Sequence, residues 1–112
     1  MDAEFAMSRE SLAHCELLTL TGELDLAAAP SVTDAVDALT DPSRPLVIDL
    51  TGLTFIDSTG IHALVHATPQ EGVVALVCNP GNVRRVLEMT RIDRVVSVYE
   101  SLDAALAEHN AA

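Results

Sequence analysis

Two nearly continuous apolar runs stand out along the chain, at residues 46–50 and 73–78. A run of about five apolar residues bounded by turn residues indicates a strand that is buried on both faces. Proline-containing polar segments precede both runs, at residues 41–45 and 69–72. We therefore predict two central, parallel strands, each entered through a loop or turn.

Apolar residues at helical spacing lie before, between and after these strands. One helix is predicted to begin at Pro30, a second at Ser58, a third after a turn at residues 79–82, and a fourth at a Ser101 cap. The core-facing positions of the first, third and fourth helices are expected to be Val32, Ala35, Val36 and Leu39, then Val83, Val86 and Leu87, then Leu102, Ala105 and Leu106.

Weaker strand patterns complete the order of elements. Residues 5–9 form an expected edge strand, residues 14–20 a neighbour that ends at the turn residue Gly22, and residues 95–99 a last strand. The order ββαβαβαβα specifies an α/β fold, with a mixed sheet of four to five strands and about four helices. The 112 residues, 1–112, suffice for one domain with a single core.

The segment Asp57-Ser58-Thr59-Gly60 falls at the carboxyl edge of the predicted parallel strands, where such sheets present their ligand-facing groups. Ser58 is predicted to be the N-cap of the following helix, with its hydroxyl near unpaired backbone N–H groups. The positive end of the helix dipole can accommodate a phosphate attached at this position. The ordinary alternative is a purely structural N-cap that contributes about 1 kcal/mol.

Residues 46–60 closely resemble the signature of STAS domains, specifically the bacterial anti-sigma-factor antagonists. Gly22-Glu23-Leu24-Asp25 resembles an early G-x-L-D element of that family, and residues 76–80 resemble its fourth strand and the following loop. The resemblance is clearest over residues 17–106. It implies a partner switch, in which the dephosphorylated protein binds an anti-sigma factor and frees the sigma factor. The resemblance also implies a GHKL-type serine kinase, usually that same anti-sigma factor, and a serine phosphatase.

The same resemblance implies which residues act. Ser58 is the expected phosphorylation site, Thr59 is a second candidate, and the expected partner-binding residues are Asp25, Asp57, Ser58, Thr59, Gly60, Ile61 and His62. A phosphate carries roughly −1.5 to −2 charges, and beside two carboxylates it would repel a partner fitted to a neutral hydroxyl. Equally well, both aspartates can be ordinary turn caps.

Three departures from the family pattern bear on the partner surface. His62 stands where the family commonly has a small residue, and Thr59 replaces the second serine of the commonest form. The interval between Gly60 and Val73 is several residues short, which predicts that the helix after Ser58 loses about one turn. Contacts with the partner are therefore expected to differ near His62.

Two other classes of function compete with the antagonist. The first is an adaptor or scaffold subunit of similar fold, for instance in a stressosome-like or lipid-transport complex. The second is an enzyme with Ser58 as nucleophile, but the Gly-x-Ser-x-Gly elbow lacks its first glycine. His62 and His66 have the spacing of a metal pair without the glutamate of a zincin, and a phosphate-binding loop is excluded because the chain has no lysine. We predict no catalytic residue, metal or cofactor.

The composition limits where in the cell the protein can work and in which redox state its cysteines stand. No apolar run approaches the roughly 18 residues of a membrane span, and the acidic start at residues 1–4 is unlike a secretory signal, so a cytoplasmic location is predicted. Cys15 and Cys78 lie in apolar stretches and are expected to be buried and reduced. Two such cysteines make no metal site.

Charge is the strongest compositional bias, with a net value of −11 that repels phosphate backbones and excludes direct nucleic-acid binding. Four of the six basic residues cluster at Arg84, Arg85, Arg91 and Arg94. The rest of the surface is almost purely acidic and suits a partner with a basic face, although such charge also serves solubility alone.

Overall fold

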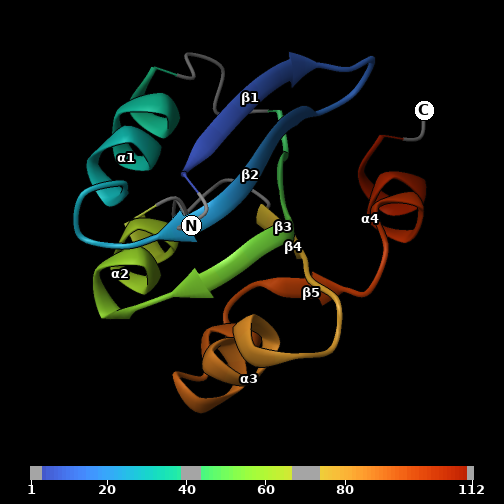
Figure 1. Cartoon of the computed structure of the whole chain (residues 1–112). Helices are drawn as coiled ribbons and strands as arrows, with labels where there is room; N and C mark the ends of the chain where they lie inside the picture. Colours follow the sequence, from blue (N-terminus) through green and yellow to red (C-terminus); the bar gives the residue numbers. More distant parts are fainter. Residues whose placement is uncertain (1–3, 39–43, 67–73, 111–112) are drawn as a thin grey trace.

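The computed structural model describes residues 4–38, 44–66 and 74–110, which form one five-stranded sheet in the order β1-β2-β3-β4-β5 (Figure 1). The strands are β1 (Ala6–Ser11), β2 (Glu16–Leu24), β3 (Leu46–Ile56), β4 (Val74–Val77) and β5 (Ser97–Tyr99). The helices are α1 (Ala29–Asp37), α2 (Ser58–His66), α3 (Asn82–Met89) and α4 (Leu102–His109), with a short 3₁₀ helix η1 (Ile92–Arg94). β1 pairs antiparallel with β2, and all other pairs are parallel. The predicted α/β fold and order of elements are confirmed.

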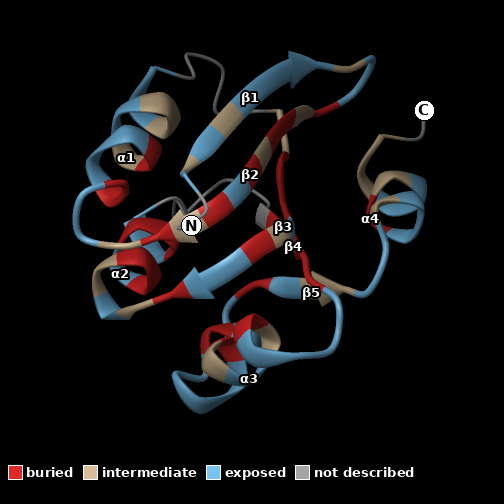
Figure 2. Ribbon diagram, in the orientation of Figure 1, coloured by how far each residue is buried: buried red, intermediate tan, exposed pale blue. Residues whose placement is uncertain are grey.

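Helices cover the two faces of the sheet unequally. Successive strand residues point to opposite faces, so Leu18 and Ile48 face one side while Leu17 and Val47 face the other. The larger core, which we call the major core, is closed by α1, α2 and α3. Figure 2 shows buried segments both in the strands and in these three helices. Burying each large side chain there stabilises the fold by about 1.5 to 3 kcal/mol.

The opposite face of the sheet carries a smaller cluster, the minor core, which is closed by α4. Its fully or nearly fully buried members are Cys15, Leu17, Val47, Ala75, Val77 and Ala105. Ser101 caps α4 as predicted, because its hydroxyl accepts a hydrogen bond of 3.2 Å from the backbone N–H of Ala104. The C-terminal end of α4 is fastened by Asn110, whose side-chain oxygen accepts a hydrogen bond of 2.8 Å from the backbone N–H of His14.

Both central strands next to the candidate site are longer than predicted. The strand expected at residues 46–50 continues to Ile56, and the strand expected at residues 14–20 continues to Leu24. The two extensions pair with each other, with register shifts that interrupt the sequence pattern. Gly22, predicted to end its strand, lies inside it at a φ of 88°, where an added Cβ would collide with the carbonyl oxygen of Glu4.

The C-terminal part departs from prediction in one place. The last strand, predicted at residues 95–99, begins only at Ser97, because η1 and an exposed Val95 precede it. The third helix is confirmed, with Val83 and Leu87 buried. Leu39, most of the segment at residues 41–45 and the turn at residues 69–72 lie outside the described residues.

Both cysteines are buried and unpaired with each other, as predicted. Cys15 belongs to the minor core and Cys78 to the major core. Burial raises the pKa of both thiols above its ordinary value, which keeps them protonated and poorly reactive.

Candidate functional site

Asp57 separates the end of β3 from the start of α2 and caps the helix. Its carboxylate oxygen Oδ1 accepts hydrogen bonds from the backbone N–H of Gly60 at 3.0 Å and from the hydroxyl of Thr59 at 2.6 Å. These two bonds, the Thr59 bond first, hold the pKa of the Asp57 carboxyl below its ordinary value of 3.8. The prediction that Ser58 is the N-cap is therefore wrong, because the carboxylate of the preceding residue satisfies the helix N–H groups instead.

Ser58 is the first residue of α2, and its side chain is exposed. Within the described part of the chain, no group is hydrogen-bonded to its hydroxyl. Thr59 differs in both respects, because it is half-buried and its hydroxyl donates to Asp57. Of the two neighbouring hydroxyls, only that of Ser58 is accessible without breaking the cap.

Gly60 brings α2 close to the end of β2. A Cβ at this position would lie 2.6 Å from the carbonyl oxygen of Leu24 and 2.8 Å from a side-chain carbon of Ile56. Real Cβ atoms do not approach backbone oxygens so closely, so the packing requires glycine. Ile61, expected on the partner surface, is 6% exposed and contributes mainly to the major core.

Asp25 follows the end of β2 at the same edge of the sheet, since Leu24 pairs with Ile56. The backbone N–H of Asp57 donates to the carbonyl oxygen of Leu24 at 3.3 Å, which joins the two strand ends directly. The Asp25 carboxylate accepts hydrogen bonds of 3.1 Å from the backbone N–H groups of Ala27 and Ala28. Asp25 therefore caps the turn into α1, the structural role that its position after a strand allows.

His62 and His66 lie one helical turn apart on α2, and their surroundings differ. His66 Nε2 lies 2.8 Å from Asp37 Oδ1 on α1, while His62 is exposed. Over the described residues, no group of three metal-ligating side chains is close enough to hold an ion. The two histidines separate two hollows on the surface of α2, one of about 690 Å³ beside Ser58 and one of about 280 Å³ beside Thr59.

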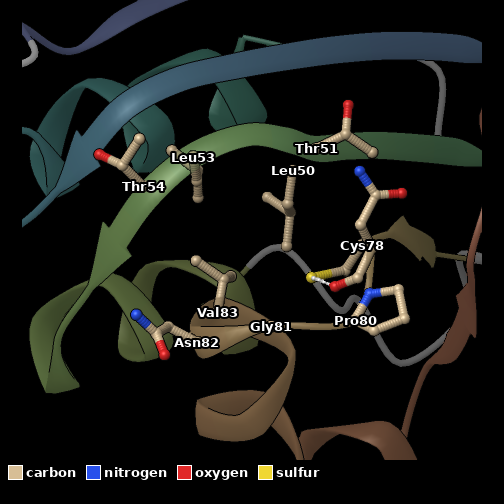
Figure 3. A pocket seen from close by; sticks show the side chains of 10 residues that line it. Leu50, Thr51, Leu53, Thr54, Cys78, Pro80, Gly81, Asn82 and Val83 are labelled. Carbon is tan, nitrogen blue, oxygen red and sulfur yellow. Dashed lines mark hydrogen bonds between the residues drawn. The ribbon is translucent and has the colours of Figure 1, made fainter.

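The turn predicted at residues 79–82 follows β4, and because β4 is parallel to β3 it reaches the same edge of the sheet. A hollow of about 370 Å³ lies between β3 and the start of α3, and Figure 3 shows Leu50 and Leu53 pointing across it toward Val83. Arg84 turns back along α3 and donates to the carbonyl oxygen of Cys78 at 3.4 Å, whereas Arg85, Arg91 and Arg94 are exposed.

Three apolar residues near the site are exposed, which was not predicted from the sequence. Leu26 is 71% exposed in the turn after Asp25 and lines the hollow beside Thr59 and His62. Phe55 is 46% exposed near the end of β3, and Val65 is 48% exposed on α2 beside the hollow at Ser58. Such residues could have been found from the sequence, because each is an apolar residue in a turn or on the polar side of its strand or helix.

Comparison with known proteins agrees with this arrangement. The family model for the STAS domain matches residues 7–105. The anti-sigma-F factor antagonist RsfB of Mycobacterium tuberculosis is 27% identical over 94 residues, which cover 80% of this chain and 77% of that protein. None of the helices among the described residues is long and apolar enough to cross a membrane.

Two solved structures extend the similarity to the fold. An anti-sigma factor antagonist from Mycobacterium paratuberculosis superimposes with a TM-score of 0.87 at 27% identity, covering 96% of each chain. An anti-sigma-factor antagonist (STAS) domain protein from Planctomyces limnophilus gives a TM-score of 0.70 at 25% identity, covering 97% of this chain and 99% of that one.

Proposed function

Because this chain belongs to the STAS domain family, we propose that it acts as an anti-sigma-factor antagonist whose contact with an anti-sigma factor is switched by phosphorylation of Ser58. The observation that carries the proposal is the exposed, unengaged hydroxyl of Ser58 on a first helical turn held by Asp57. The names of the relatives from both mycobacteria support the class of partner.

In the unphosphorylated state the partner contacts a neutral surface. That surface consists of Ser58 and the neighbouring residues of α2, with the exposed side chains of Leu26, Phe55 and Val65 at its border. Apolar side chains of this kind stabilise a protein interface once they are removed from water. The partner is therefore expected to bury them around an uncharged hydroxyl.

Phosphorylation changes the charge of this surface while leaving the fold intact. The positive end of the α2 dipole favours a phosphate at the first residue of the helix. A protein interface disfavours the same phosphate, because the phosphate lies next to the Asp57 carboxylate and must lose its water on binding. The fold and the complex thus respond in opposite directions, which is what a switch requires.

Ser58 is the proposed acceptor in preference to Thr59 for a physical reason. Phosphorylation of Thr59 would remove the hydroxyl that donates to Asp57 and place a dianion within the cap of α2. The enzymes that act on Ser58 are proposed to be the anti-sigma factor itself, as a GHKL-type serine kinase, and a serine phosphatase. All of these events are proposed to take place in the cytoplasm.

Capture of the protein from its native cell tests this function. Wild type, Ser58→Ala and Thr59→Val are recovered by affinity tag, and bound proteins and phosphosites are identified by mass spectrometry. We expect a GHKL-type kinase with all three proteins, and phosphate on wild type and Thr59→Val but not on Ser58→Ala. Phosphate on Ser58→Ala would place the site elsewhere, and capture of a transporter or a large scaffold in place of the kinase would favour an adaptor.

A further inference from the structure

His62 lies one helical turn beyond Ser58 on the same side of α2. Residues four apart in a helix are neighbours on its surface. Both side chains are exposed, and both line the hollow that Val65 and His66 on α2 share with Thr90 at the end of α3. A group added to the Ser58 hydroxyl can therefore reach the imidazole without any change in the backbone.

None of the described residues that line the two hollows beside His62 carries a carboxylate. Toward α1, the neighbouring hollow is lined by Leu26, Ala29, Pro30 and Thr33, all uncharged. On α2 itself, His66 lies 2.8 Å from Asp37 of α1 and is already engaged. From the end of β3 the nearby charge is Asp57, whose Oδ1 accepts two hydrogen bonds within the cap. Among the described residues lining the two hollows, only His62 and His66 can become cationic.

We propose that protonated His62 is the counter-cation of a phosphate on Ser58 and makes the phosphorylated state sensitive to pH. The proposal rests on the proposed function, since it concerns the product of that phosphorylation. Histidine changes charge within the physiological pH range, and a cation four residues along a helix favours the dianionic form of a phosphate. The neutral Ser58 hydroxyl offers no such charge, so the unphosphorylated state gains nothing from the pair.

The consequence is that the phosphorylated state, which does not bind the partner, repels it less strongly in acid. At high pH, His62 is neutral, and the phosphate adds its full charge beside Asp57. As His62 becomes protonated, part of that charge is cancelled one helical turn away, so a partner is repelled less. A residue without a titratable side chain at position 62 could not have this effect, so the device depends on the histidine.

Titration of the phosphate itself tests the pair without any kinase or partner. Phosphoserine is installed at position 58 during translation with a suppressor tRNA, and the ³¹P resonance is followed from about pH 5 to pH 8, around the second phosphate pKa of about 6. We expect the midpoint to rise by about half a unit in His62→Gln and to stay at the wild-type value in His66→Gln. The difference should shrink in about 1 M salt.

Identical midpoints in wild type and His62→Gln would overturn the role of His62. An equal rise in His66→Gln would also overturn it, because the effect would then be a general charge change rather than a pair one turn apart. Neither result bears on whether Ser58 is phosphorylated in the cell, which the capture experiment decides separately.

Discussion

The helices α2 and α3 begin at the same edge of the sheet, after the neighbouring strands β3 and β4, but their first turns are built differently. At the start of α2, the Asp57 carboxylate accepts two hydrogen bonds, and Gly60 packs against Leu24. At the start of α3, the cap residue is Gly81, with a φ of 148° and no side-chain hydrogen bond to the helix. An added Cβ at Gly81 would meet nothing within 4 Å.

This difference separates what the fold requires from what the site requires. The topology of the sheet is satisfied by the uncapped, open turn before α3, so a rigid first turn is not a condition of folding. The turn before α2 nevertheless has a charged cap and close packing, and the residue it presents is Ser58. The proposed function accounts for this order, because it needs the serine held in one position on the surface.

Ser58→Asp should have the largest effect, on binding rather than on folding. The added charge lies beside Asp57, so affinity for the anti-sigma partner should fall about a hundredfold, or about 2.7 kcal/mol. The helix dipole favours aspartate at this position, so the thermal melt should be unchanged. Calorimetric titration beside a melting curve measures both effects.

Asn82→Asp is the matched control, because Asn82 is the exposed first residue of α3. It adds the same charge at the same edge of the sheet and should leave affinity unchanged. Equal losses of affinity in Ser58→Asp and Asn82→Asp would show that the surface that binds the partner is not confined to α2. In the Ser58→Asp background, Asp25→Asn should restore part of the affinity if repulsion is the cause.

Gly60→Ala should have the largest effect on stability. The added Cβ would collide with the carbonyl oxygen of Leu24. The movement of α2 that removes this collision should lower the free energy of unfolding by about 2 kcal/mol and shift Ser58. Gly81→Ala meets only backbone strain and should leave partner affinity intact. Urea unfolding and calorimetry distinguish the two, and a fully stable Gly60→Ala protein would contradict the close packing.

Asp57→Ala should cost about 1 kcal/mol at neutral pH, the usual value of a lost N-cap. Asp57→Asn keeps an acceptor and should lose less. Because the folded state lowers the pKa of Asp57, the stabilisation from its charge is present above about pH 4, the unfolded value, and is lost as pH falls through the folded value. The free energies of unfolding of wild type and Asp57→Asn, measured in urea, should therefore converge in acid. A difference between the two that persists in acid would show that the effect comes from side-chain shape alone.

His66→Ala should change stability least, by less than about 0.5 kcal/mol. Its contact with Asp37 lies at the surface, where both side chains are about half exposed or more, at 49% and 65%. Added zinc should leave the melting temperature of wild type unchanged, because the residues that the structure describes hold no cluster of three metal-ligating side chains. A zinc-dependent rise that disappears in His66→Ala would contradict this reading of the histidine pair.

The start of α2 could be located from sequence, but the identity of its cap could not. Asp57, Ser58 and Thr59 are all good capping residues, and only the position of Gly60 relative to each side chain decides among them. The last part of β3 was missed for a different reason. Thr51, Gly52 and Thr54 break the apolar pattern, and their strand conformation depends on pairing with distant residues of β2.

The position of α4 has a consequence for how the chain matures. Asn110 is bonded to the backbone of His14 across 96 residues of sequence, and Ala105 closes the minor core over Cys15 and Leu17. The contacts that fix the first turn of α2, by contrast, come only from residues of β2, β3 and α2. During synthesis on the ribosome, the face carrying Cys15 therefore stays uncovered until α4 has left the exit tunnel, and any nascent chain stopped before that point displays an unfinished apolar surface to chaperones.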